Sequence, residues 1–171
     1  MLKILNNLGP FFEDCYRRIS VREYANLIKI SPPTASKLLK AYHKHGLIHK
    51  HEERRHIFFY LNNENKDAID LCRIYWRKKL HSISTALQKT FLNPTAILFG
   101  SAAKAELKAD SDIDIALFTR GRKILSLKQH EKQLKRGISV YHFRSLQDIK
   151  NKHLRNNILN GYVLFGKLRW E

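Results

Sequence analysis

The sequence predicts an α+β chain of two domains, whose second half follows an α/β arrangement. In residues 1–62, capped helical segments precede two strand-like segments that end in a tight turn. After a long helical stretch, residues 94–171 alternate apolar strands with short helices, which is typical of a mixed sheet with flanking helices. With 43% hydrophobic residues, the 171 residues suffice for two small domains that each bury a modest core.

The first elements are helices with recognisable ends. A short helix is expected from Leu2 to Leu8, ended by Gly9-Pro10, and the apolar pair Phe11-Phe12 follows. Ser20 is a predicted N-cap for a helix over residues 21–28. These segments would close a small N-terminal core.

A second capped helix is expected from Pro32 to His45. Ser31 is its predicted N-cap, Pro32 occupies the first helical position, and Gly46 should stop it. Its spacing places an apolar face opposite a basic one. The apolar face carries Ala35, Leu38, Leu39 and Tyr42, and the basic face carries Lys37, Lys40 and Lys44.

Residues 47–51 and 56–61 are predicted to form a β-hairpin around the turn Glu52-Glu53-Arg54-Arg55. This order of helices and hairpin, with the stretch SPPTASKLLKAYHKHGLI, resembles the winged helix-turn-helix domains of transcription regulators. The resemblance implies that the helix over residues 32–45 enters the major groove and the hairpin tip contacts phosphate or the minor groove. The DNA-binding residues expected on this basis are Thr34, Lys37, Lys40, Lys44, Arg54 and Arg55.

The charge balance favours a nucleic acid partner over a solvated lysine face or a protein-binding winged helix. Lys and Arg number 32 against 15 Asp and Glu, a net charge of +17 spread over both halves of the chain. Such a charge attracts polyanions, with double-stranded DNA as the first candidate. A histidine cluster in the same region invites a metal interpretation, but its spacing is not a recognised zinc pattern. The cluster comprises His43, His45, His49, His51 and His56.

Residues 63–93 are predicted to form a linker helix between the domains. Asn63 is a plausible cap, the amphipathic pattern continues to Thr90, and Asn93-Pro94 closes it. A second subunit is a candidate for packing against this helix, which would make a homodimer.

Two carboxylates in the second half suggest a metal site. Residues 95–99 and 112–118 read as strands, and alternation along the second strand would place Asp112 and Asp114 on one face. Neighbouring carboxylates repel unless a cation compensates them, and hard divalent cations such as Mg²⁺ prefer oxygen ligands. Between the strands, Gly100 permits a close backbone approach, and Ser101 would cap a helix over residues 102–107, which together suggest a phosphate cradle.

The run GSAAKAELKADSDID, in which ten residues separate Gly-Ser from Asp-x-Asp, resembles the minimal nucleotidyltransferases of the polymerase-beta-like superfamily. The resemblance covers roughly residues 94 to 168. It implies that Gly100 and Ser101 bind the phosphates of a nucleoside triphosphate, with ATP as the expected substrate. Asp112 and Asp114 would hold Mg²⁺ or Mn²⁺ as the catalytic pair, and Lys104 would take the place of a family Arg near the phosphates.

One departure concerns the third carboxylate that active members of the family carry on a later strand. The corresponding segment GISVYHF contains no acid, and Tyr141 or His142 stands where the third acid would align. A neutral His142 could act as a base near its ordinary pKa of about 6.5, but a half-buried strand histidine is the simpler interpretation. Glu131 and Asp148 are the nearest acids and are unconvincing replacements.

These observations predict a winged helix-turn-helix domain over 1–62, a linker helix over 63–93 and a nucleotidyltransferase-like domain over 94–171. The predicted reaction is transfer of a nucleoside monophosphate to an unknown hydroxyl acceptor. One alternative is an inactive DNA-binding transcriptional regulator whose C-terminal domain senses nucleotide or dimerises. Another is an antitoxin that adenylylates or binds a helical partner toxin, as related proteins do.

The remaining composition excludes several classes of protein. The two cysteines, Cys15 and Cys72, argue against a disulfide framework and fit a reducing cytoplasm. The apolar start is too short and too interrupted for a signal or membrane segment, so no membrane partner is expected.

Overall fold

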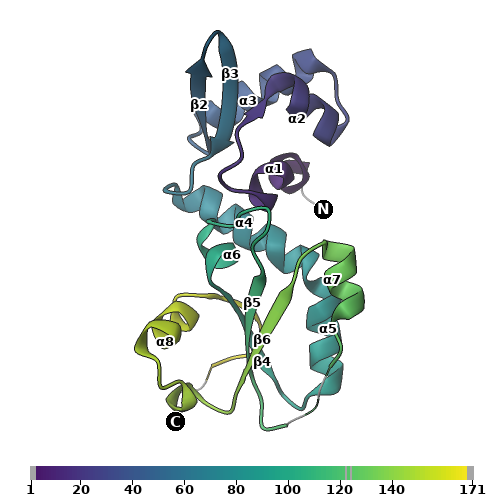
Figure 1. Cartoon of the computed structure of the whole chain (residues 1–171), viewed down its shortest axis with the longest axis vertical. Helices are drawn as coiled ribbons and strands as arrows, with labels where there is room; N and C mark the ends of the chain where they lie inside the picture. The colour runs from purple at the N-terminus through teal and green to yellow at the C-terminus, as the bar shows by residue number, and fades with distance from the viewer. Residues whose placement is uncertain (1–2, 122, 124, 169–171) are drawn as a thin grey trace. The chain divides into compact units, whose positions relative to one another are not determined.

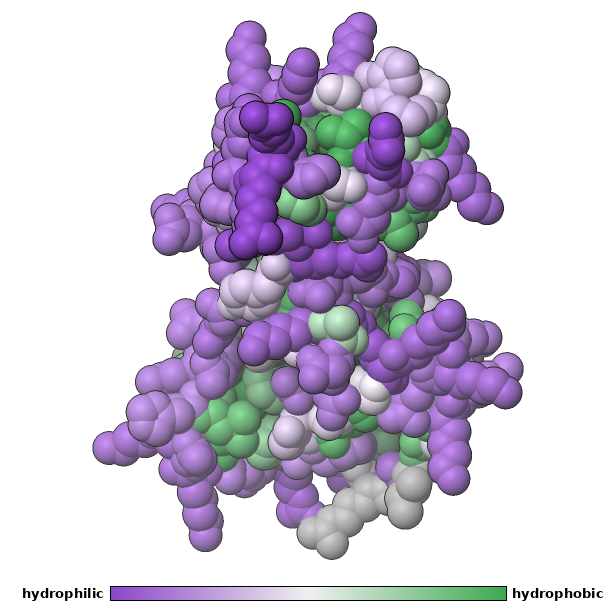
Figure 2. Space-filling view, turned by 45° about the horizontal axis from the view of Figure 1, so that its top comes forward, coloured by the Kyte–Doolittle hydropathy of each residue, from purple (hydrophilic) through white to green (hydrophobic). Residues whose placement is uncertain are grey.

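The computed structural model describes residues 3–121, 123 and 125–168, and its secondary structure confirms the α+β class. The chain divides into two compact units. The first comprises Met1–Tyr75 with Ala105–Ala109, and the second comprises Trp76–Lys104 with Asp110–Glu171. We describe each unit by itself. No helix among the described residues is long and apolar enough to cross a membrane, and hydrophilic residues dominate the face drawn in Figure 2.

The first unit has the element order of a winged helix (Figure 1). Its elements are α1 (Lys3–Glu13), β1 (Ile19–Ser20), α2 (Val21–Ile28), α3 (Pro32–Lys44), β2 (Ile48–Glu53) and β3 (His56–Leu61). The three strands form an antiparallel sheet in the order β1-β3-β2. Strand β1 was not predicted because its two residues give no alternating pattern and are fixed by pairing with Phe58 and Phe59.

The predicted caps Ser20 and Ser31 are present, whereas Asn65 takes the place of the predicted cap Asn63 by accepting the N–H of Ala68. The Ser20 hydroxyl accepts the N–H of Glu23, and the Ser31 hydroxyl accepts the N–H of Thr34. Each bond satisfies one of the free N–H groups at the start of a helix. Gly46 follows α3 with φ +70°, a conformation that glycine adopts without steric cost.

The prediction that Gly9-Pro10 ends the first helix is wrong, since α1 continues to Glu13. Leu2 lies outside the described residues. Gly9 and Pro10 disfavour a helix locally, but continuing the helix buries Phe11 and Phe12 completely. The burial of these two rings outweighs the local preference. Gly9 serves close packing here: an added Cβ would come within 3.3 Å of the Tyr75 ring.

The single linker helix predicted over residues 63–93 is two helices, α4 (Lys66–Lys79) and α5 (His81–Thr90). The break falls at Leu80, whose φ of −86° and ψ of 7° depart from α-helical geometry. Leu80 is fully buried, and so are Trp76 before it and Ile83 after it. The two helices therefore both keep apolar side chains in the core. The amphipathic pattern spans the break, which explains why the sequence conceals it.

The second unit is built on a mixed four-stranded sheet with the order β6-β5-β4-β7. Its strands are β4 (Thr95–Phe99), β5 (Ile113–Phe118), β6 (Ile138–Phe143) and β7 (Tyr162–Phe165). Strand β4 pairs antiparallel with both β5 and β7, whereas β5 and β6 are parallel. The remaining elements are α6 (Ser101–Lys104), α7 (Lys128–Leu134), the 3₁₀ turn η1 (Leu146–Asp148) and α8 (Lys152–Leu159).

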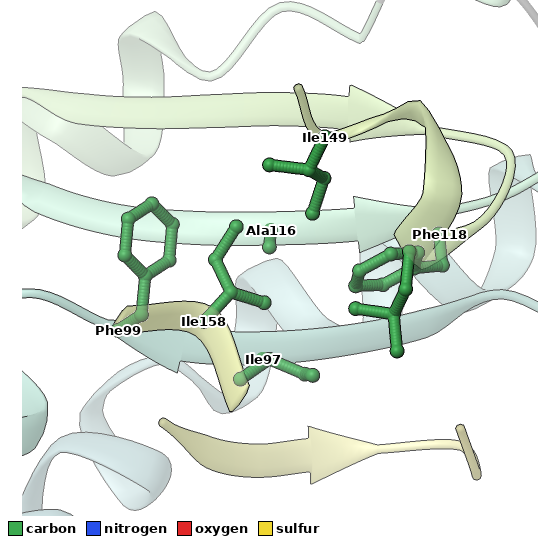
Figure 3. Close-up of a cluster of buried hydrophobic side chains, with 7 residues drawn as sticks. Ile97, Phe99, Ala116, Phe118, Ile149 and Ile158 are labelled. Carbon is green, nitrogen blue, oxygen red and sulfur yellow. The ribbon is translucent and has the colours of Figure 1, made fainter. Parts of the chain in front are cut away.

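One face of this sheet carries the core drawn in Figure 3. Ile97 and Phe99 of β4 pack with Ala116 and Phe118 of β5, beneath residues of η1 and α8. Figure 1 shows α8 on one side of the sheet and α5 on the other. Side chains alternate along a strand, and directly paired residues share a face of the sheet. Alternate residues of β5, counted from Ala116, therefore lie on the same side as Phe99, the side that α8 covers. Asp114 belongs to that set.

Candidate functional site

The two predicted metal ligands come together at one end of the sheet in the second unit. Asp114 is the second residue of β5, between Phe99 of β4 and Ser139 of β6. Asp112 stands just before the strand and is exposed, whereas Asp114 is partly buried. Burial and the neighbouring charge of Asp112 raise the pKa of Asp114 above its ordinary value. Neither carboxylate forms an ion pair with a basic side chain among the residues that the structure describes.

Each carboxylate lies against a glycine that leaves room for it. A Cβ added to Gly100 would come within 2.6 Å of Asp114 Oδ2, and one added to Gly137 would collide with the carboxylate of Asp112. Gly100 also has φ +69°, which a residue with a side chain rarely adopts. Gly137 was not identified from the sequence, since only the pairing of β5 with β6 brings it beside Asp112.

The phosphate cradle differs in detail from the predicted one. In place of the helix expected over residues 102–107, the structure has the four-residue α6, which begins at Ser101 and ends at Lys104. Ala105 follows it with φ +56°. Ala105 and Leu107 are fully buried, and burial favours a turn over a longer helix. So short a helix provides little dipole, and the close approach allowed by Gly100 becomes the main local feature.

Lys104 reaches the last turns of α8. Its Nζ donates a hydrogen bond to Asn157 Oδ1 at 3.0 Å. The lysine is exposed, and its predicted place near phosphates stays a prediction.

The structure places Tyr141, and not His142, beside the aspartates. The Tyr141 side chain lowers the pKa of Asp114 and so opposes the rise caused by burial and by the charge of Asp112. Its ring packs edge-on against Phe99 with 5.4 Å between centroids. His142 pairs with Leu117 on the opposite face of the sheet and lies against Phe91. The suggestion that His142 acts as a base beside the aspartates is therefore wrong, because strand alternation turns it away from them.

The two nearest acids have structural roles. Glu131 accepts the N–H of Ile138 at 3.1 Å, and Asp148 accepts the N–H groups of Arg144 and Ser145 at 2.9 Å. Within the described ranges, no three His, Cys, Asp or Glu side chains gather in a group that could hold a metal. Tyr141 thus occupies the third position beside the aspartate pair.

Arg136 supports the turn that carries the first aspartate. Its Nη1 donates to the carbonyl of Ser111 at 2.8 Å, and its guanidinium lies over the Trp76 ring at 5.7 Å. Sequence reasoning missed this residue, because nothing local to Arg136 points to a residue 25 positions earlier.

In the first unit, all the predicted DNA-binding side chains are exposed. They are Thr34, Lys37, Lys40 and Lys44 on α3, and Arg54 and Arg55 at the hairpin tip. None of the five cations forms an ion pair with a carboxylate in the described part of the chain. The hairpin turn is shorter than predicted because β2 extends to Glu53, leaving only two arginines at the tip, both with positive φ.

The nearby histidines have ordinary surroundings. His43 Nδ1 lies 3.1 Å from the carbonyl oxygen of Ile48, and the ring of His49 packs against Tyr60. His56 lies beside the ring of Phe58. The described histidines belong to no group of three or more side chains that could hold a metal.

The comparisons with known proteins identify the second unit. Residues 81–169, just over half of the chain, match the family described as Polymerase beta, Nucleotidyltransferase. The chain belongs to the polymerase beta nucleotidyltransferase family. The match contains the Gly-Ser turn, both aspartates and Tyr141, so the nucleotidyltransferase resemblance seen in the sequence is confirmed.

Similar solved structures were also found, all with low scores. The crystal structure of apo (heme-free) PefR is 24% identical, with a TM-score of 0.35 over 47% of this chain and 69% of that chain. The heme complex of the heme sensor protein PefR from Streptococcus agalactiae is also 24% identical. Its TM-score is 0.35, over 48% of this chain and 56% of that chain. Likeness at this level carries no functional argument. None of the curated proteins compared matches the chain.

Proposed function

We propose that the second unit binds a nucleoside triphosphate with a divalent cation at Asp112 and Asp114 and transfers its nucleoside monophosphate to a hydroxyl acceptor. The observation that carries this proposal is the uncompensated aspartate pair beside the Gly100 turn, in a chain of the polymerase beta nucleotidyltransferase family. ATP is the simplest substrate. Members of this family typically use Mg²⁺ with a nucleoside triphosphate.

The residues present suit a hard cation. Two carboxylates supply oxygen ligands. Burial and the charge of Asp112 raise the pKa of Asp114, and a bound cation would oppose both effects. Gly100 and Gly137 keep the space around both carboxylates free of side chains. Two protein ligands leave further coordination positions for triphosphate oxygens and water, which is how Mg²⁺ is usually bound. Mn²⁺ would fit the same donors.

Each residue then has a defined task. Asp112 and Asp114 would hold the cation, which supplies charge neutralisation at the transferring phosphate. Gly100 and Ser101 would let the triphosphate approach the backbone, and Lys104 would add a positive charge nearby. Tyr141 would help to keep Asp114 ionised, because its side chain lowers the pKa of that carboxyl. An incoming hydroxyl would attack the α-phosphorus, and pyrophosphate would leave.

The first unit supports a role in binding double-stranded DNA. The exposed cations on α3 and at the hairpin tip have no ion-pair partners within the described ranges, so they are available to phosphates. The complete proposal joins a DNA-binding domain over 1–62, a linker over 63–93 and a nucleotidyltransferase domain over 94–171. The proposal includes a homodimer. It also includes a helical partner protein, which could supply the acceptor hydroxyl as in a toxin–antitoxin pair.

A second candidate function is a DNA-binding regulator that senses a nucleotide without turnover. The observation that favours it is Tyr141, because a phenol stands where a third carboxylate would otherwise join the pair. A neutral phenol accepts the proton of an attacking hydroxyl far less readily than a carboxylate does.

The test incubates the protein with α-³²P-labelled nucleoside triphosphates, Mg²⁺ and a lysate of its own cells. The matched control is the Asp112→Asn/Asp114→Asn variant. Label that appears only with the intact pair would support transfer and reveal the acceptor. Nucleotide binding without label would refute transfer and support the sensing regulator.

A further inference from the structure

A pocket of the second unit lies at the end of the sheet away from the aspartates. Its volume is about 1190 Å³. Thr95 and Phe118, which pair with each other, line it, whereas Phe99 and Asp114 pair at the other end of the same strands. Four residue steps along β4 correspond to about 13 Å, so the pocket is separate from the aspartate site.

Among the residues that the structure describes, the charged side chains lining this distal pocket are all basic. They are Arg120, Lys123, Arg144 and Lys167. All four are exposed, and none forms an ion pair with a carboxylate in the part of the chain that the structure describes. The nearby acid Asp148 is held by the backbone N–H groups of Arg144 and Ser145. The pocket is thus lined by four basic residues that no carboxylate among the described residues pairs with.

Apolar side chains form the other part of the lining. Phe91, Pro94, Phe118 and Leu146 are buried beneath it, and Leu92 at the mouth is 87% exposed. Because Phe91 and Phe118 are buried, their rings cannot act as open stacking platforms for successive bases. A concave site with an apolar floor and a few cations suits a small molecule that has both an apolar ring and phosphate groups.

We propose that the distal pocket binds a phosphorylated small molecule of the nucleotide type, with its phosphates on Arg120, Arg144 and Lys167 and its ring on the apolar floor. This second site does not depend on the aspartate pair. It requires no divalent cation, because the protein itself supplies the positive charge. A cleft lined by one sign of charge also raises the local concentration of the opposite ion.

The experiment measures binding of ATP and of tripolyphosphate by calorimetry, in EDTA and on the Asp112→Asn/Asp114→Asn background. These conditions remove metal-dependent binding at the aspartates. Both probes should bind, ATP more tightly because tripolyphosphate has no ring. The pocket variant Arg144→Gln/Lys167→Gln should weaken both by about tenfold or more, since two charge-assisted contacts are lost.

A matched variant, Lys132→Gln/Lys152→Gln, removes two exposed charges from α7 and α8 outside the pocket lining. It should change either affinity by less than about twofold. Thermal unfolding checks that the variants fold, and Lys167→Gln alone replaces the double variant if that one does not. The proposal is overturned if neither probe binds or if pocket and control variants lose affinity equally. Binding of single-stranded RNA alone, with neither small anion retained, would also overturn it.

Discussion

At the scale of single residues, the site is shaped by glycines and by side-chain alternation. The Gly-Ser and Asp-x-Asp spacing, which is local in sequence, predicted the grouping of Gly100, Asp112 and Asp114, and these residues lie together in the structure. Their roles stay predictions. Gly137 and Tyr141 lie near the aspartates because β6 pairs with β5 in a particular register. No local sequence pattern predicts that register. Tyr141 and His142 could not be separated until that register placed them on opposite faces.

Gly100→Ala should damage both stability and nucleotide binding. An alanine at φ +69° costs about 1–2 kcal/mol, and its Cβ would press on Asp114. Urea unfolding and calorimetry with Mg-ATP would measure the two effects. The control for the effect on stability is Gly121→Ala, because its Cβ would stand at an ordinary contact distance of 3.5 Å from Phe91 and its φ is outside the left-handed region. Equal effects of the two substitutions would contradict this account.

Asp114→Asn should raise the melting temperature of the metal-free protein at neutral pH. Because folding raises the pKa of this carboxyl, the folded state binds its proton more tightly, and stability falls as pH rises from the unfolded pKa through the folded one. Replacing the charge removes that penalty. Thermal unfolding in EDTA, with the exposed Asp110→Asn as control, measures it. A lower melting temperature for Asp114→Asn at pH 7 would show that its charge is already compensated.

At the scale of elements, helix caps and the hairpin were predictable, whereas helix continuity was not. Ser20, Ser31 and Gly46 mark ends that depend only on neighbouring residues. The passage of α1 through Pro10 and the break at Leu80 depend on burial, which the local sequence does not reveal.

The two arginines at the hairpin tip supply positive charge but adopt a backbone conformation that lowers the stability of the fold. Arg54 and Arg55 both have positive φ, as a two-residue turn with the favoured twist demands, and Asn-Gly is the preferred pair there. Arg54→Asn/Arg55→Gly should stabilise the protein by about 1 kcal/mol or more while weakening DNA binding. Chemical denaturation and titration with labelled duplex DNA would measure both changes.

The matched variant is Arg54→Lys/Arg55→Lys, which keeps both charges and the backbone strain. It should retain most of the DNA affinity and gain no stability. If the Asn-Gly variant bound DNA as well as the original chain, the hairpin tip would have no part in the interface.

At the scale of the whole molecule, the net charge of +17 predicts polyanion binding without saying where it occurs. The structure offers two places: the exposed cations of the first unit and the distal pocket of the second. The pocket was not predicted, because residues from four separate segments line it.

The α3 lysines should supply salt-dependent affinity for DNA. Lys37→Gln/Lys40→Gln/Lys44→Gln should reduce the slope of log affinity against log salt by about 3, nearly uniformly across DNA sequences. Titrations at several salt concentrations measure the slope. The control, Lys128→Gln/Lys132→Gln/Lys135→Gln, removes three exposed charges from the second unit. An equal loss in both variants would mean that net charge alone governs the binding.

The central claim is that Asp112 and Asp114 form a metal–nucleotide site, and calorimetric titration with ATP tests it most directly. The account predicts a binding component that requires Mg²⁺ and disappears both in EDTA and in the Asp112→Asn/Asp114→Asn variant. A Mg²⁺-dependent component of unchanged affinity in that variant would contradict the claim.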